Sequence, residues 1–202
     1  MKTWILVPII MVLAPIVETN NFRTENHKNL SINKIKNLTM ENTDFTTSIV
    51  VDNSPKEVYE AINNVRGWWS EEIEGPTDTL HKEWFYHYKD IHLCKMKVVE
   101  LESNKIVVWE VKENSFNFVE DQNEWVGNRL IFDIQEEGDK TKLTFTQEGL
   151  TSFYECYNVC QEAWTNYIHN SLYKLITTGK GEPNPKEGEG YNKQLSDKWK
   201  LK

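Results

Sequence analysis

Alternation of apolar and polar residues predicts that most of the chain forms β-strands. Phe45 to Val51 alternate weakly and are largely β-branched, which is typical of a strand. Further strands follow, separated by turn residues. In one of them Lys95 and Lys97 must reach water, so the residues that alternate with them face inward. The predicted inward positions are Trp84, Tyr86, Tyr88, His92, Cys94, Met96, Val107, Trp109, Val111, Leu130, Phe132, Ile134, Leu143, Phe145 and Gln147. The stretch 114–127 is predicted to be a loop, and the pattern gives about five or six strands.

Two segments instead have the 3.6-residue period of helices. Ser54 and Glu57 form a capping box with Pro55 at the first helical position, so a short helix begins there. A second, long helix is predicted from Ser152 to Thr178, with Ser152 and Glu155 as its capping box and Gly179 after its end. One arc of the long helix carries Phe153, Tyr157, Cys160, Trp164, Tyr167, Ser171 and Leu175. This arc is rich in aromatic rings and thiols, which favours either a lid over an aromatic-lined cavity or an ordinary core helix.

The two ends of the chain differ from its centre. Residues 1–39 contain an apolar run, Trp4 to Val17, that is too short to span a bilayer comfortably and lacks a signal-peptide cleavage site. We therefore interpret 1–39 as a disordered leader or an over-extended start, with Met40 as the functional start; the alternative is an export signal. Residues 40–181 then form one domain. The segment 182–202 is rich in Pro, Gly and charge, and is predicted to be a flexible tail onto which Trp199 could dock.

The composition of the chain limits the classes of molecule that the protein is expected to bind. A net charge of −8 argues against nucleic acid and anionic membranes, and no membrane span is expected. Eight Trp residues indicate a large aromatic core or pocket. Three Cys residues form no disulfide framework, which favours reduced thiols and a cytoplasmic location.

Four side chains could carry chemistry if the fold brings them together: His92, Cys94, Cys156 and Cys160. Imidazole and thiolate are ligands for zinc or copper, and a Cys–His pair could be nucleophilic. However, no metal-binding spacing, orienting third group or oxyanion-hole loop is recognisable, and there is no phosphate-binding glycine loop. We therefore expect no metal, no cofactor and no catalytic residues, so that an enzyme is less favoured than a binding protein.

The aromatic residues are the stronger functional signal. With Gln147 and the tyrosine hydroxyls as polar anchors they could line one pocket, although the same rings could equally pack as a solid core. The candidate lining residues are Trp68, Trp69, Trp84, Tyr86, Tyr88, Cys94, Trp109, Trp125, Gln147, Tyr157, Cys160 and Trp164.

Several stretches resemble a known family. Residues 45–51 followed by 54–59 look like the opening strand and helix of the START-like (helix-grip, SRPBCC) superfamily. Residues 64–70, 88–90 and 148–150 resemble bacterial proteins of the activator of heat-shock protein 90 ATPase homologue-like type. The resemblance implies an α+β helix-grip fold. In that fold, short helices near the N-terminus and one long C-terminal helix accompany a curved antiparallel sheet of about six strands, and the long helix closes a cavity.

The resemblance also implies the candidate functions. Members of the superfamily bind small apolar molecules in the cavity, so non-catalytic binding of an apolar or aromatic ligand is our first hypothesis. The alternative is a co-chaperone-like module whose partner is a chaperone or another protein. An enzyme using the cavity Cys and His residues comes third.

Overall fold

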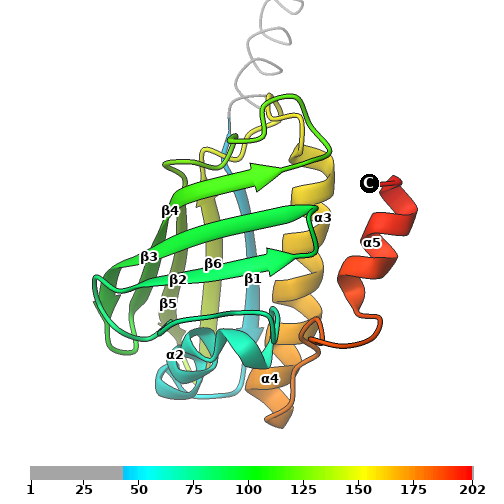
Figure 1. The fold of residues 1–202 in the computed structure, drawn as a ribbon. Helices are drawn as coiled ribbons and strands as arrows, with labels where there is room; N and C mark the ends of the chain where they lie inside the picture. The colour runs from blue at the N-terminus through cyan, green and yellow to red at the C-terminus, as the bar shows by residue number, and fades with distance from the viewer. Residues whose placement is uncertain (1–42, 202) are drawn as a thin grey trace, which may run out of the picture. The chain divides into compact units, whose positions relative to one another are not determined.

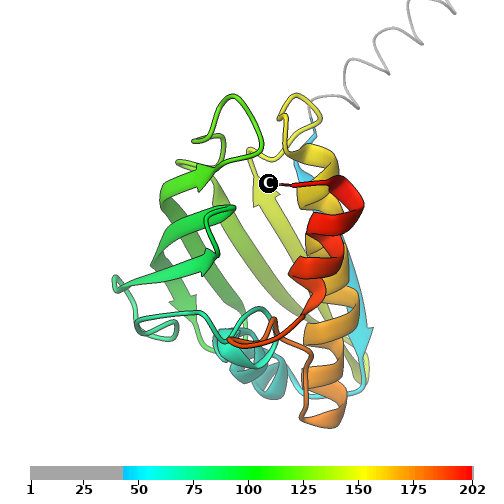
Figure 2. The same ribbon diagram turned by 45° about the vertical axis from the view of Figure 1, so that its right-hand side comes forward.

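The computed structural model describes residues 43–201, which contain a six-stranded antiparallel sheet. The strands are β1 (Phe45–Val51), β2 (Glu83–Tyr88), β3 (His92–Glu102), β4 (Ile106–Phe116), β5 (Arg129–Glu137) and β6 (Lys140–Glu148). Their order across the sheet is β1-β6-β5-β4-β3-β2, so all neighbours but β1 and β6 are consecutive strands of the chain. The sheet curves around one face, as Figure 2 shows.

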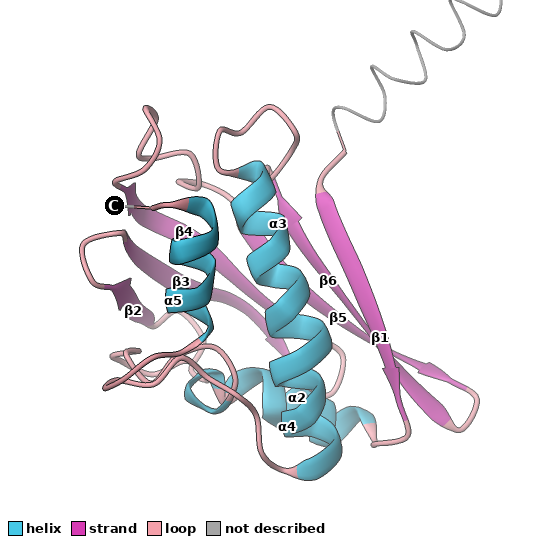
Figure 3. Cartoon of the chain, turned by 90° about the vertical axis from the view of Figure 1, so that its right-hand side faces the viewer, coloured by secondary structure: helices cyan, strands magenta, loops and turns pink. Residues whose placement is uncertain are grey.

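The helices lie on the inner side of this sheet. A short helix α2 (Pro55–Asn63) and a single turn η1 (Val65–Gly67) follow β1. After β6, α3 (Tyr157–Asn166), the π-helical segment η2 (Tyr167–Leu172) and α4 (Tyr173–Thr178) form one continuous helix. It runs across the sheet, with α2 near its α4 end and a final helix, α5 (Tyr191–Trp199), beside its α3 end (Figures 1 and 3). The α+β helix-grip architecture predicted from the sequence is confirmed.

The alternation of residues along the strands also predicts which side chains form the core. Trp84, Met96, Trp109, Phe132 and Phe145 are all fully buried, as their alternation predicts. Burial of these large side chains supplies the main driving force for closing the helix over the sheet. The loop predicted over 114–127 is partly wrong, because β4 continues to Phe116.

The start of the long helix is not where the sequence predicts it. The helix begins at Tyr157, no side chain caps it at Cys156, and Phe153 is 65% exposed rather than part of the buried arc. A carboxylate from a distant loop replaces the predicted capping box. The nearly buried Glu124 accepts hydrogen bonds from the backbone N–H groups of Glu155 and Cys156, at 3.0 Å for the latter. A carboxylate at this end also complements the helix dipole.

Replacing Glu124 with alanine should therefore lower the free energy of unfolding by about 1–2 kcal/mol, the usual cost of losing a helix N-cap. Glu120→Ala is the matched control, since it removes an exposed carboxylate from the same loop. Urea denaturation of both variants measures the difference. Equal midpoints for the two variants would contradict the capping role of Glu124.

The π-helical segment changes the face that the long helix buries. The extra residue per turn between Tyr167 and Leu172 brings Ile168 and Leu172 into the core beside Tyr167 and Ser171. The helix then ends at Gly179, whose φ of 77° is the left-handed conformation that the sequence predicts for a helix terminator.

The segment after the long helix is more ordered in structure than the sequence predicts. The predicted flexible tail over 182–202 is wrong, because residues 191–199 form α5, and Leu195 and Asn192 are buried. Gly181 lets the chain cross η1 closely, since a Cβ there would lie 2.2 Å from the Gly67 carbonyl oxygen. Trp199 docks as predicted, donating from Nε1 to Glu162 at 3.0 Å.

The predictions for the leader and for Met40 lie outside the described residues. Between residues 43 and 201, no helix combines the length and the apolar character that a membrane crossing needs.

Candidate functional site

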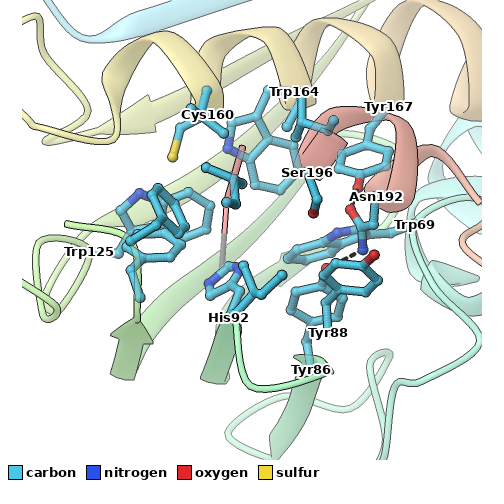
Figure 4. Close-up of a pocket in the computed structure, with 17 residues that line it drawn as sticks. Trp69, Tyr86, Tyr88, His92, Trp125, Cys160, Trp164, Tyr167, Asn192 and Ser196 are labelled. Atoms are coloured by element: carbon cyan, nitrogen blue, oxygen red, sulfur yellow. Dashed lines mark hydrogen bonds between the residues drawn. The ribbon is translucent and has the colours of Figure 1, made fainter. Parts of the chain in front are cut away.

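A small cavity lies between α3, the β2–β3 hairpin and α5 (Figure 4). Its volume is about 60 Å³. Aromatic side chains form most of the wall, and a few polar groups enter it from the hairpin and from α5. The lining residues are Trp69, Tyr86, Tyr88, Ile91, His92, Phe116, Phe118, Trp125, Val159, Cys160, Ala163, Trp164, Tyr167, Asn192, Leu195, Ser196 and Leu201.

Half of the residues expected to line a cavity are at this site. Trp69, Tyr86, Tyr88, Trp125, Cys160 and Trp164 surround it. The other six do not: Trp68, Trp84, Cys94, Trp109, Gln147 and Tyr157. The alternation along a strand and the angular position around a helix predict which way a side chain points. They do not predict whether a neighbouring side chain fills the space in front of it.

Three of these six residues, Trp68, Trp84 and Trp109, instead pack together as an aromatic core. Trp68 stacks on Trp109 with ring centroids 6.5 Å apart, and Trp84 meets Trp109 edge to face at 5.1 Å. These rings fill the η1 end of the interior, so the cavity is confined to the end near α5. Both sequence-based interpretations of the aromatic set therefore apply, each to one part of the molecule.

Gln147 lies beneath the cavity rather than in its wall. It accepts a hydrogen bond from Trp164 Nε1 at 2.6 Å and donates to Asn128 Oδ1 at 2.9 Å. This buried chain of hydrogen bonds fixes the orientation of the Trp164 ring, which borders the cavity.

The wall that α5 contributes is not predicted from the sequence. This wall consists of Asn192, Leu195 and Ser196, which lie in the segment predicted to be a flexible tail. The spacing of apolar residues is the one sequence signal that could have indicated a helix there. His92 and Tyr167 also line the cavity, although the sequence predicts only that they face inward. Phe116 lies in the stretch predicted to be a loop.

A buried polar network ties α5 to the domain. Asn192 accepts from the Tyr167 hydroxyl at 2.5 Å and donates from Nδ2 to the Tyr86 hydroxyl at 2.8 Å. Its backbone N–H donates to Asn184 Oδ1 at 2.7 Å, and Asn184 Nδ2 donates to the Trp69 carbonyl oxygen and to Tyr167. Burial raises the pKa of the Tyr86 and Tyr167 hydroxyls, so both are neutral hydrogen-bonding groups here.

His92 is enclosed by aromatic rings at the opposite side of the cavity. Phe116 lies 4.3 Å and Trp125 5.1 Å from its ring centroid, and Nε2 lies 3.0 Å from Asn114 Oδ1. Burial lowers the pKa of His92 to about 4, although the hydrogen bond to Asn114 opposes that shift. The imidazole is therefore uncharged at neutral pH.

The cysteines do not form the cluster considered from the sequence. All three are buried, but of these only Cys160 reaches the cavity; Cys156 accepts a hydrogen bond from Trp125 Nε1 at 3.3 Å. Burial raises the pKa of the Cys160 thiol well above its usual value, which keeps it protonated and a weak nucleophile. Within the described chain, no three His, Cys, Asp or Glu side chains are placed to hold a metal ion.

Comparison with solved structures supports the same architecture. The chain is similar to the Aha1 dimer from Colwellia psychrerythraea, with a TM-score of 0.56 and 22% identity over 69% of this chain and 99% of that one. It is also similar to Mll3558 from Rhizobium loti, with a TM-score of 0.52 and 13% identity over 66% and 96% of the two chains.

A third similar structure is DynU16, a protein in the dynemicin biosynthetic locus. Its TM-score is 0.50 at 14% identity, over 68% of this chain and 48% of that one. No protein-family model and no curated protein matches the sequence. At these identities the likeness establishes the fold alone. The chain therefore has the START-like helix-grip fold of the Aha1 structure, as its sequence motifs predict.

Proposed function

We propose that this protein binds a small apolar or aromatic molecule in the cavity between α3, the β2–β3 hairpin and α5, without catalysing a reaction. One observation carries the proposal: a cavity borders α5, and aromatic rings form much of its wall. Concave apolar sites with a few polar groups are typical of ligand pockets.

The size of the cavity requires that one wall move. About 60 Å³ is room for one or two water molecules, whereas an engineered protein cavity that binds benzene has about 150 Å³. The sheet and α3 are held by strand pairing and by the core, so α5 is the wall that can yield. A nine-residue helix without a side-chain cap is not stable by itself in water, and α5 depends on its docking contacts.

The linker to α5 supports such a movement. Residues 182–190 contain Pro183, Pro185 and two glycines, and Gly188 has a φ of 100°. Outside the polar network, ion pairs and hydrogen bonds from Lys198 and Trp199 to Glu162 hold α5, and such half-exposed contacts are weak individually. These contacts are therefore the ones that α5 can give up most easily when a ligand enters.

Titration with the neutral fluorescent probe N-phenyl-1-naphthylamine tests the proposal. We expect saturable binding at one site per chain, with quenching of the buried Trp fluorescence. Native mass spectrometry of protein isolated from its own host should then show a co-purifying small molecule. No saturable binding, together with a bound protein in the mass spectrum, would instead favour the co-chaperone-like module, whose support is the family resemblance alone.

Filling the cavity should abolish probe binding. Ala163 lines it, so Ala163→Leu places a branched apolar side chain in the free volume and should raise the probe Kd at least about tenfold. The control is Thr165→Leu, which adds a similar side chain at an exposed position of the same helix and should leave Kd unchanged. If Ala163→Leu binds as well as the control, the probe does not occupy this cavity.

A further inference from the structure

The cavity wall has no formal charge. None of the residues that line it, all within the described chain, is Asp, Glu, Lys or Arg. An ionised ligand group would therefore be buried without a counter-charge, which is strongly unfavourable. The wall thus favours uncharged ligands.

Most polar atoms of the wall already have partners inside the protein. Trp164 Nε1 is bound to Gln147, Trp125 Nε1 to Cys156, and Asn192 to the tyrosine network. The Tyr88 hydroxyl, by contrast, is buried and has no hydrogen-bond partner among the described residues. A buried hydroxyl without a partner is costly, so a ligand that bonds to it gains affinity.

His92 supplies an acceptor. Asn114 donates from Nδ2 to the Gln122 carbonyl oxygen at 2.9 Å, which fixes the orientation of its amide and leaves Oδ1 facing His92. His92 Nε2 must therefore carry the proton that is donated to Oδ1. The lone pair of the neutral ring is then on Nδ1, for which the described residues provide no partner.

The donor and the acceptor are neighbours. Tyr88 and His92 are directly opposite each other in the register of β2 and β3, and both side chains line the cavity. Opposite residues on one face of an antiparallel pair have Cβ atoms about 4.5–5.5 Å apart. The donor and the acceptor therefore come from paired positions in the wall of the same cavity.

We propose that the cavity is specific for uncharged aromatic molecules that carry a hydroxyl group, such as phenols. The ligand oxygen accepts a hydrogen bond from the Tyr88 hydroxyl, and its own O–H donates to His92 Nδ1. The inference rests on the proposed function, since it assigns a ligand class to the same cavity. The pKa of about 4 for His92 supports it, because the ring remains an acceptor at neutral pH.

Calorimetric titration of the full chain at pH 7 with naphthalene, 2-naphthol and 2-naphthoate tests the ligand class. We expect 2-naphthol to bind about tenfold or more tightly than naphthalene, because two net hydrogen bonds are added. The carboxylate should bind at least about tenfold more weakly than 2-naphthol. If none of the three binds, the proposed function itself is overturned. If naphthalene equals 2-naphthol, or 2-naphthoate is the tightest, only the hydroxyl specificity is overturned.

Two substitutions assign the specificity to these residues. Tyr88→Phe removes only the unpartnered hydroxyl and should reduce the preference for 2-naphthol over naphthalene at least about threefold, with naphthalene affinity unchanged. His92→Phe keeps an aromatic ring but removes the acceptor, with the same expected result. Tyr173→Phe is the control, since Tyr173 is an exposed residue on α4 that does not line the cavity. An unchanged preference in Tyr88→Phe, which should fold normally, would overturn the proposal whatever the stability of His92→Phe.

Discussion

Replacing Trp164 with alanine should lower the free energy of unfolding by about 3–5 kcal/mol, the range for a fully buried large aromatic side chain. Trp164 is 1% exposed and is surrounded by rings, with centroids at 4.6 Å for Phe145 and 5.0 Å for Trp69. The variant also leaves Gln147 Oε1 buried without its donor, which adds to the loss. Urea denaturation monitored by circular dichroism measures the change.

Trp199→Ala is the control for this prediction. Trp199 is 38% exposed, and its contact is a hydrogen bond to Glu162 on the surface, so its removal should cost less than about 1 kcal/mol. A Trp164→Ala midpoint as close to wild type as that of Trp199→Ala would mean that the long helix does not dock by this face.

Lowering the pH from 7 to about 4 should destabilise the protein by about 2–3 kcal/mol through His92 alone. Its folded pKa of about 4 is below the ordinary value of 6.5, so the unfolded chain binds more protons in this interval. Stability is therefore fully present above pH 6.5 and is lost as the pH falls toward 4. A difference of one between the folded and unfolded pKa corresponds to about 1.36 kcal/mol of stability. The difference between 6.5 and about 4 therefore sets the upper limit of the destabilisation. The partial exposure of the His92 side chain reduces the effect below that limit.

His92→Phe isolates this contribution from the carboxylates that titrate in the same range. The variant should lose less stability between pH 7 and 4 than wild type, by the same amount of about 2–3 kcal/mol. His81→Asn, at an exposed histidine, should follow the wild-type curve. Parallel curves for wild type and His92→Phe would show that the burial of this imidazole does not govern the acid stability.

The sequence alone determined the architecture because its signals are local. A period of two along a strand fixes which side chains face inward, and Trp84, Trp109 and Phe132 are buried accordingly. The capping box at Ser54 begins α2, with the backbone of Glu57 bonded to the serine hydroxyl and the Ser54 N–H bonded to the glutamate side chain, as predicted. The αL residue Gly179 likewise ends the long helix.

Tertiary contacts decided where the long helix starts and which face it buries. Glu124, in a loop 31 residues earlier in the chain than Glu155, caps the helix, and no local pattern reports such a partner. The π-helical segment adds one residue to the turn at Tyr167, which a constant angle per residue cannot anticipate.

The cavity likewise depended on contacts between distant segments. Trp68 and Trp69 are neighbours in sequence, yet only Trp69 lines the cavity, because Trp109 and Phe132 pack around Trp68. The α5 wall is polar in composition and docks through Asn192, whose partners Tyr86 and Tyr167 are 106 and 25 residues away. The sequence thus determined which residues face the interior, and the packing of distant segments decided which of them border empty space.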